Sequence, residues 1–194
     1  MPLEIHNHKS DGICNILETG HSKLGGLKHC DLQRILLMMQ QTHSTQSLEL
    51  NMSKTYQSVV INAPAGKVWS KLRNFHDLSW APDVVSSVEA VGDKKGDQLG
   101  AKRILNEAFH ETLTDLDDEE YSLRYSIDDG PSPVSKDEVS DYEGRILVRP
   151  VTEGDGGAFV EWYSSWNGKG EEAEQFCHGI YVSLLGELKK NLEI

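Results

Sequence analysis

Arg103 and Glu111 lie close together in the sequence, on either side of the short segment Asn106–Ala108. If that segment is a three-residue hairpin loop, Arg103 faces Glu111 directly and both side chains point to the same side of the sheet. On an inner face, the guanidinium would hold the carboxylate ionised in apolar surroundings. Such a pair can orient a ligand carbonyl or carboxylate, or let Glu111 remove a proton from an acidic C–H or O–H group.

The same residues leave two alternatives open. A two-residue turn would pair Arg103 with His110 and send Glu111 to the opposite face, because a shift of one residue inverts every side chain. With the first register, the pair could instead lie on a solvated face, where a cross-strand ion pair contributes at most about 1 kcal/mol. The loop length and the face of the sheet therefore decide whether this pair is a site.

Two tyrosines in later segments are further candidates for binding. Tyr125 alternates with Leu123 and Ile127, and Tyr142 alternates with Gly144 and Ile146, so each lies on the apolar face of a predicted strand. Their hydroxyls could donate to a ligand oxygen. The alternative is that both are core aromatics whose hydroxyl groups reach water at an edge.

Metal and cofactor chemistry has little support in the sequence. Most histidines lie in residues 1–51 with Cys14 and Cys30, at spacings that match no compact zinc site. His76 and His110 are isolated and belong to no recognisable hydrolytic triad. Residues 154–157 are glycine-rich but lack the lysine and the helix of a phosphate-binding loop. We therefore predict neither a metal nor an organic cofactor.

The charge and the cysteines narrow the classes of partner. A formal net charge of −12, from 19 Lys and Arg against 31 Asp and Glu, repels the phosphate backbone and argues against nucleic-acid binding. No apolar run approaches the ~18 residues of a spanning helix, so we predict no stable membrane insertion. The chain has an odd number of cysteines, Cys14, Cys30 and Cys177, which argues against a disulfide framework and predicts reduced thiols.

Reduced thiols in turn predict a cytoplasmic protein.

Hydrophobic alternation and turn residues predict an α+β fold. The first strand is followed by a helix that begins after Pro64, and a second short helix is predicted over Phe75–Trp80. After Gly170, a continuous apolar stripe predicts a long C-terminal helix. No helices separate the later strands, so the sheet is antiparallel and curves around the last helix. The predicted strands cover residues 56–61, 84–91, 100–105, 109–116, 121–127, 139–148 and 158–166.

Aromatic residues divide the chain into two parts. Every Trp, Tyr and Phe lies between Tyr56 and Tyr181, and a segment without aromatics contributes little to a core. We therefore predict an N-terminal extension over residues 1–52, expected to be flexible, and a folded domain over residues 53–194. Within the extension, the stretch Asp31–Met39 has the spacing of a short amphipathic helix.

Several short motifs, in this order of elements, are similar to those of a known superfamily: Asn62–Trp69, Leu78–Pro82, Glu111–Leu113, Asp115–Asp117, Asp129–Val134 and Val160–Trp162. From about residue 54 to 192, the chain resembles the START/Bet v 1-like (SRPBCC) superfamily and, within it, the polyketide cyclase/dehydrase branch. The resemblance implies a helix-grip fold. In that fold a seven-stranded sheet, with two short helices after its first strand, wraps the C-terminal helix and encloses a cavity for a hydrophobic small molecule.

Two better-understood kinds of relative suggest site residues. Abscisic-acid receptors and the onion lachrymatory factor synthase share a Gly-x-x-Arg strand and a Glu-x-Leu strand, which here are similar to Gly100–Arg103 and Glu111–Leu113. The resemblance implies that Arg103 and Glu111 bind the ligand, and that they act in the chemistry if the protein is an enzyme. It also implies further residues at the cavity, namely Tyr125, Tyr142, Glu161, Phe176, Ile180 and Leu184.

The chain departs from the receptor pattern in one respect. The receptors have a mobile gate loop between the Arg and Glu strands, whereas Asn106–Ala108 is too short for one, which argues against a hormone-gated switch. The segment Gly130–Asp137 is the remaining candidate for an entrance flap. The orientation of Glu161 also stays open, because the receptor pattern points it inward while burial alone favours Trp162.

We therefore expect a protein that binds an apolar or amphipathic small molecule between the sheet and the C-terminal helix. The alternative is a cofactor-independent cyclase, dehydratase or isomerase in which Glu111 is the general base and Arg103 stabilises the developing oxyanion. A third hypothesis is an interaction protein whose N-terminal extension docks on a partner. The sequence also leaves a homodimer open.

Overall fold

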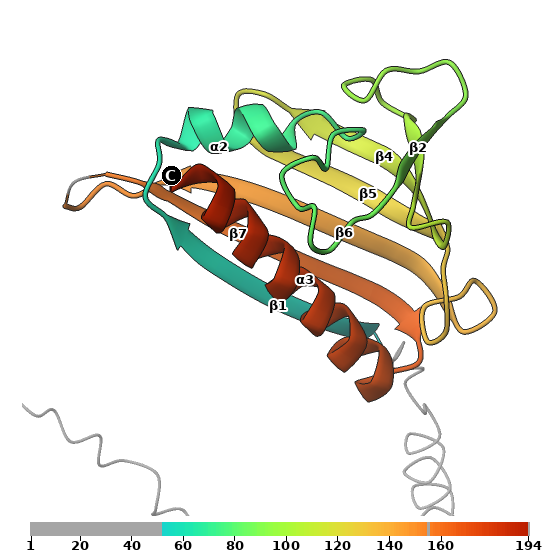
Figure 1. Cartoon of the computed structure of the whole chain (residues 1–194). Helices are drawn as coiled ribbons and strands as arrows, with labels where there is room; N and C mark the ends of the chain where they lie inside the picture. Colours follow the sequence, from blue (N-terminus) through green and yellow to red (C-terminus); the bar gives the residue numbers. More distant parts are fainter. Residues whose placement is uncertain (1–51, 155, 194) are drawn as a thin grey trace, which may run out of the picture. The chain divides into compact units, whose positions relative to one another are not determined.

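The computed structural model describes residues 52–154 and 156–193. These residues form a seven-stranded antiparallel sheet in the order β1-β7-β6-β5-β4-β3-β2, which curves around one long helix (Figure 1). The predicted α+β helix-grip architecture is thereby confirmed. Its elements are β1 (Met52–Ile61), α2 (Ala65–Leu72), β2 (Val88–Val91), β3 (Lys102–Leu105), β4 (Phe109–Asp117), β5 (Ser122–Asp129), β6 (Val139–Pro150), β7 (Ala158–Gly168) and α3 (Glu171–Leu192).

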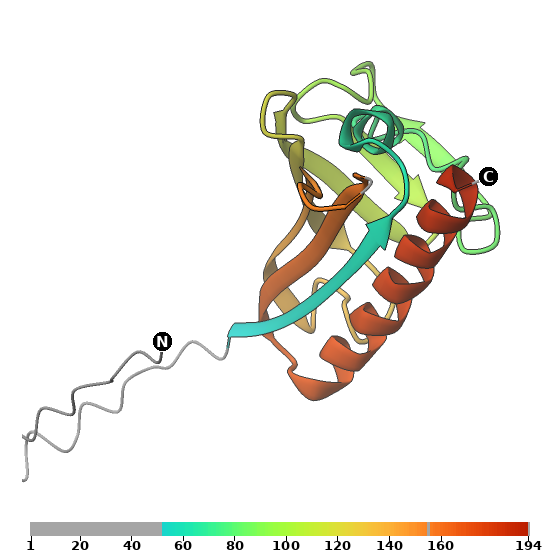
Figure 2. The ribbon, with the colours of Figure 1, turned by 90° about the vertical axis from the view of Figure 1, so that its left-hand side faces the viewer.

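The helix α3 lies across the concave face of the sheet, as the side view in Figure 2 shows. Its buried side chains recur at helical spacing, which is the apolar stripe that the sequence predicted. Phe176 and Ile180 lie at the margin of this stripe and are half-buried. The fully buried members of the stripe that face the sheet are Ala173, Cys177, Tyr181, Leu184, Leu185, Leu188 and Leu192.

The β3–β4 hairpin has the register of a three-residue loop. Arg103 pairs with Glu111, and Leu105 pairs with Phe109. Asn106 is in the left-handed region with φ 51°, and its side chain accepts a hydrogen bond from the Ser86 amide at 2.8 Å. Asparagine tolerates this conformation better than most residues, so the loop is compatible with its sequence. The alternative with Arg103 opposite His110 is excluded.

The second short helix predicted over Phe75–Trp80 is wrong, because these residues form turns. The Asn74 side chain accepts from the His76 amide at 3.2 Å, and the Asp77 side chain accepts from the Ser79 amide at 3.0 Å. Such local bonds offer the backbone an alternative to the helical ladder. The apolar residues that suggested a helix are still buried, with Phe75 only 1% exposed.

The strand predicted over residues 84–91 is shorter than expected, since β2 begins only at Val88. The amides of Val84 and Val85 both donate to the Ala81 carbonyl, at 3.1 and 2.9 Å, and this forms a turn. The segment before β2 is consequently free to cross toward the β3–β4 hairpin, where Asn106 Nδ2 donates to the Val84 carbonyl at 3.1 Å.

The predictions for the extension fall outside the described residues. The structure describes only Met52 of the predicted extension over residues 1–52. The short helix predicted over Asp31–Met39 therefore lies outside the described residues. Among the helices of the described part, none has the length and apolar character needed to cross a membrane.

Candidate functional site

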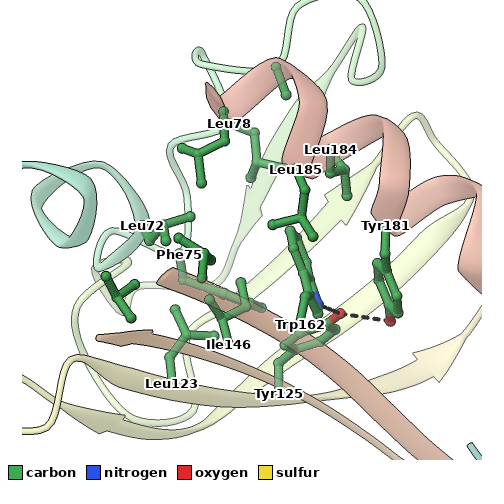
Figure 3. Packing of buried hydrophobic residues seen from close by; sticks show 14 of the residues in the cluster. Leu72, Phe75, Leu78, Leu123, Tyr125, Ile146, Trp162, Tyr181, Leu184 and Leu185 are labelled. Atoms are coloured by element: carbon green, nitrogen blue, oxygen red, sulfur yellow. Dashed lines mark hydrogen bonds between the residues drawn. The ribbon is translucent and has the colours of Figure 1, made fainter. Parts of the chain in front are cut away.

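A cavity of about 130 Å³ lies between the concave face of the sheet and α3. One wall is formed by the β3–β4 hairpin and the segment before β2, and the opposite wall is formed by α3. Figure 3 shows the packing of the buried hydrophobic cluster, which includes the lining residues Leu78, Tyr125, Trp162, Tyr181 and Leu184. The lining residues are Leu78, Val84, Val85, Arg103, Leu105, Asn106, Phe109, Glu111, Tyr125, Ile127, Tyr142, Trp162, Cys177, Ile180, Tyr181 and Leu184.

The Arg103–Glu111 pair forms the charged part of the cavity wall. Arg103 Nε donates to Glu111 Oε2 at 2.7 Å, and both residues are 6% exposed. A second donor of the guanidinium, Nη1, bonds to the Phe75 carbonyl. The guanidinium carbon also lies 3.7 Å from the centre of the Phe75 ring, within the range of a cation–π interaction. The turn at Phe75 therefore holds Arg103 in place from a different part of the chain.

Burial controls the ionisation of Glu111. Its removal from water raises the pKa of the carboxyl above the ordinary value, although the charge and the hydrogen bond of Arg103 oppose this shift. A carboxylate with a raised pKa is a stronger base than an exposed one. Glu111 therefore combines limited contact with water, a fixed cationic neighbour and increased basicity.

A chain of hydrogen bonds connects the polar aromatic groups inside the domain. Trp162 Nε1 donates to Tyr125 Oη at 3.0 Å, and Tyr125 Oη lies 2.9 Å from Tyr181 Oη (Figure 3). Tyr181 Oη is in turn 2.6 Å from Tyr142 Oη, which reaches Ser164 Oγ at 3.0 Å. Buried hydroxyls that satisfy each other in this way fix their rings in one arrangement.

Burial also keeps these groups neutral. The pKa values of Tyr125, Tyr142 and Tyr181 are all raised well above the ordinary value, mainly because the phenolates would be desolvated. The pKa of the Cys177 thiol is raised for the same reason. The hydroxyls can therefore act as hydrogen-bonding groups, and the thiol lacks the depressed pKa of a reactive cysteine.

Most of the site residues suggested by the sequence meet at this cavity. Tyr125 and Tyr142 lie on its sheet side, and Ile180 and Leu184 lie on its helix side, together with the charged pair described above. Phe176 is not among the lining residues. Its ring stacks on that of the lining residue Phe109, with centroids 6.3 Å apart.

Glu161 lies outside the cavity, which corrects the prediction that it lines it. It is on the outer face of β7, where its Oε1 accepts a hydrogen bond from the exposed Tyr56 hydroxyl at 2.9 Å. Its neighbour Trp162 is 2% exposed and points inward. Side chains alternate along a strand, and burying the large indole stabilises the fold more than burying an unpaired carboxylate.

The predicted entrance flap, Gly130–Asp137, does not line the cavity either. Val134 within it is 1% exposed and packs into the core. The hydroxyls of Ser132 and Ser135 both donate to the Glu138 carboxylate, at 3.0 and 2.8 Å. Apart from the sheet and α3, the residues that border the cavity are Leu78, Val84, Val85 and Asn106 of the β3–β4 loop.

Sequence reasoning missed Tyr181 and Trp162 as members of the site. Tyr181 was included in the helical stripe, but its role as the link between Tyr125 and Tyr142 depends on contacts across the domain. Gly144 is the feature of the sequence that could have indicated this packing of tyrosine rings. A Cβ atom at this position would collide with the ring of Tyr125, so the glycine leaves the space that this ring occupies.

Within residues 52–154 and 156–193, no three His, Cys, Asp or Glu side chains gather in an arrangement that could hold a metal ion. The prediction that the protein works without a metal or an organic cofactor stays a prediction.

A comparison with family models identifies the family of this chain. The model of the family described as polyketide cyclase / dehydrase and lipid transport matches residues 52–193. A solved structure from Nitrosospira multiformis is 43% identical, covers 72% of this chain and 95% of its own, and superposes with a TM-score of 0.69. No curated protein matches the chain.

Two Bacillus structures are more distant. The protein XoxI from Bacillus cereus is 25% identical and an uncharacterised protein from Bacillus thuringiensis is 26% identical, each with a TM-score of 0.58. Each match covers 72% of this chain. It covers 95% of the Bacillus cereus protein and 98% of the Bacillus thuringiensis protein.

Proposed function

Because this chain belongs to the polyketide cyclase/dehydrase and lipid transport family, we propose that it binds a small amphipathic molecule in the cavity between the sheet and α3. The apolar part of the ligand packs against Ile180 and Leu184 on the helix. Its polar group lies at the sheet side, beside the Arg103–Glu111 pair. The observation that carries this proposal is a buried ion pair in the wall of an otherwise largely apolar cavity.

The energetics of the ion pair support a role in binding. Burying two charges has a large desolvation cost, and apolar residues of the same volume often give equal or greater stability. A pair retained at a cavity wall therefore favours a polar ligand group as its third partner. The volume supports a small ligand, because about 130 Å³ approaches the ~150 Å³ of an engineered cavity that holds benzene.

Blocking the cavity tests this proposal. Ile180→Trp and Leu184→Trp should fill the space next to the helix, whereas Val182→Trp on the same helix is a matched control at a position that is 49% exposed. We would compare the three variants with the wild type by native mass spectrometry and by thermal-shift titration with benzamide. The two cavity variants should lose the thermal shift by benzamide and any small molecule that native mass spectrometry detects on the wild type, and the control should retain both.

The folded state of the variants decides how to interpret that result. If Ile180→Trp and Leu184→Trp fold and still bind as the wild type does, the proposed site is wrong. If both unfold by circular dichroism while Val182→Trp folds, these positions are solid core, and the proposed cavity is again wrong.

A second candidate function is a cofactor-independent cyclase, dehydratase or isomerase. The raised pKa of the buried Glu111 favours it. Glu111 would take the proton from a C–H next to a ligand carbonyl, the electron pair would move to the carbonyl oxygen, and Arg103 would stabilise the resulting oxyanion. The proton would then return to a different atom of the ligand.

Glu111→Gln separates the two functions. The variant keeps the size and hydrogen-bonding capacity of the side chain but cannot accept the proton. If the second function is correct, turnover of a neutral carbonyl compound that the wild type converts is abolished in this variant while its binding remains. If the wild type converts no such compound and only binds it, the binding function alone stands.

A further inference from the structure

We propose that the cavity selects ligands whose polar group is uncharged, and that Glu111 is the residue that excludes anions; this inference rests on the proposed binding function. Arg103 and Glu111 are the only charged side chains among the described residues that line the cavity. Their charges cancel, so an uncharged ligand leaves the cavity neutral. A carboxylate ligand would instead add one unpaired negative charge.

The cation of the cavity is already engaged. Arg103 Nε donates to Glu111 at 2.7 Å, and Nη1 bonds to the Phe75 carbonyl. The guanidinium also lies over the Phe75 ring. A ligand carboxylate would therefore compete with Glu111 for a cation that three contacts hold in place. Anions gain most from arginine when two N–H groups face them without a competing carboxylate.

A neutral carbonyl group meets no such competition. A guanidinium has five N–H groups, and the contacts to Glu111 and Phe75 occupy only two of them. One further N–H is sufficient for a carbonyl oxygen, and this bond leaves the Arg103–Glu111 pair intact. Glu111 can also accept a hydrogen bond from an N–H or O–H of the same ligand, because a carboxylate has several lone pairs.

The rest of the lining cannot neutralise an anion. The hydroxyls of Tyr125, Tyr142 and Tyr181 are already joined in a hydrogen-bonded chain and carry no charge. A buried charge without a partner is strongly disfavoured, and a like charge nearby increases the cost. Removing the charge of Glu111 should reverse this preference, because Arg103 is then left as an unpaired cation.

Benzamide and benzoate are suitable probes because they are nearly equal in size and shape and differ in charge at pH 7. Each is titrated into the full chain, and its affinity is measured from the chemical shifts of backbone amides. We expect the wild type to bind benzamide at least about tenfold more tightly than benzoate, and Glu111→Gln to prefer benzoate.

Glu161→Gln is the matched control. It removes the same charge from the protein, but from the outer face of the sheet, where Glu161 contacts Tyr56. It should bind both probes as the wild type does. A reversed preference in this variant as well would mean that the overall charge of the protein, and not the cavity, decides.

The outcomes separate this inference from the proposed function. Equal binding of the two probes by the wild type, or tighter binding of benzoate, overturns the inference and leaves the binding function in place. Failure of both probes to bind overturns the proposed function and the inference with it. If Glu111→Gln does not fold, the comparison of the two probes on the wild type still decides.

Discussion

Arg103–Glu111 and Arg73–Asp118 are ion pairs of nearly equal length, 2.7 and 2.8 Å, in very different surroundings. Both side chains of the first pair are 7% exposed, whereas those of the second are 36% and 53% exposed. The pKa of Asp118 is lowered to about 2, because Arg73 and the Trp69 indole donate to it. The pKa of Glu111 is raised, because desolvation outweighs the effect of Arg103.

Two ion pairs of nearly the same length therefore accompany opposite shifts in the pKa of the carboxyl group. In water, a carboxylate has little desolvation to overcome, so an arginine lowers its pKa. Inside the domain, the same contact only limits the cost of burial. The exposed pair thus links α2 to the turn after β4, whereas the buried pair maintains charged groups at a place where a ligand could use them.

The largest expected difference between the two pairs comes from removing each arginine. Arg103→Met should lower the free energy of unfolding by about 3–5 kcal/mol at pH 7, because it leaves a buried carboxylate without a partner. Arg73→Met should cost at most about 1 kcal/mol. Urea denaturation followed by tryptophan fluorescence measures both values.

The pH dependence identifies the cause of the loss in Arg103→Met. The pKa of Glu111 is higher in the folded state than in the unfolded state. Its contribution to the free energy of unfolding is therefore fully present below pH 4.5 and is lost as the pH rises through the folded pKa. The cost of this substitution should therefore be larger at pH 7 than at pH 4. Equal costs at both pH values would show that lost packing, and not the charge of Glu111, destabilises the variant.

A second, smaller contrast concerns hydroxyl groups. Tyr181→Phe removes the hydroxyl between Tyr125 and Tyr142 and should cost about 1–3 kcal/mol, because buried polar groups lose a partner. Tyr56→Phe removes only the bond to Glu161 on the outer face and should stay within about 0.5 kcal/mol. Thermal and urea unfolding of the two variants measure the difference, and equal costs would contradict the assigned role of the hydroxyl chain.

The smallest of these contrasts concerns the carboxylate of the exposed pair. Asp118→Asn should cost at most about 1 kcal/mol at pH 7. Because the folded pKa lies near 2, below the ordinary 3.8, this stabilisation is present above pH 3.8 and is lost as the pH falls through about 2. Unfolding measured between pH 2 and pH 7 should show the two proteins converge in acid. Asp93→Asn, in an exposed turn, is the control, and the same convergence there would argue against a specific role of Arg73.

The sequence predicted much of this arrangement because the patterns involved are local. Alternation allowed only two registers for the hairpin, and one of them placed Arg103 opposite Glu111. The apolar stripe of the last helix likewise identified Leu184 and its neighbours as the inner face. Each of these predictions depends on the period of a helix or a strand, which neighbouring residues establish.

Other features depended on partners that are distant in the chain. The Asn106 side chain anchors the hairpin loop to Ser86 and Val84, and no local pattern contains that contact. The turns at Phe75–Trp80 were mistaken for a helix because their apolar spacing fits both structures. The burial of Trp162, and with it the outward orientation of Glu161, depended on the stacking of Trp162 on Tyr181 of α3.

The sequence by itself therefore determined that Arg103 and Glu111 can pair, and which strands and which helix surround them. Only the tertiary structure decided that this pair is buried and that Phe75 holds it from a third segment. It also decided that Tyr181 joins Tyr125 and Tyr142. The physical reason is that pairing depends on local geometry, whereas ionisation depends on the solvent that the whole domain excludes. An arginine–carboxylate contact links an exposed turn at Asp118 to α2. A contact of the same kind at Glu111 forms the charged part of a cavity wall.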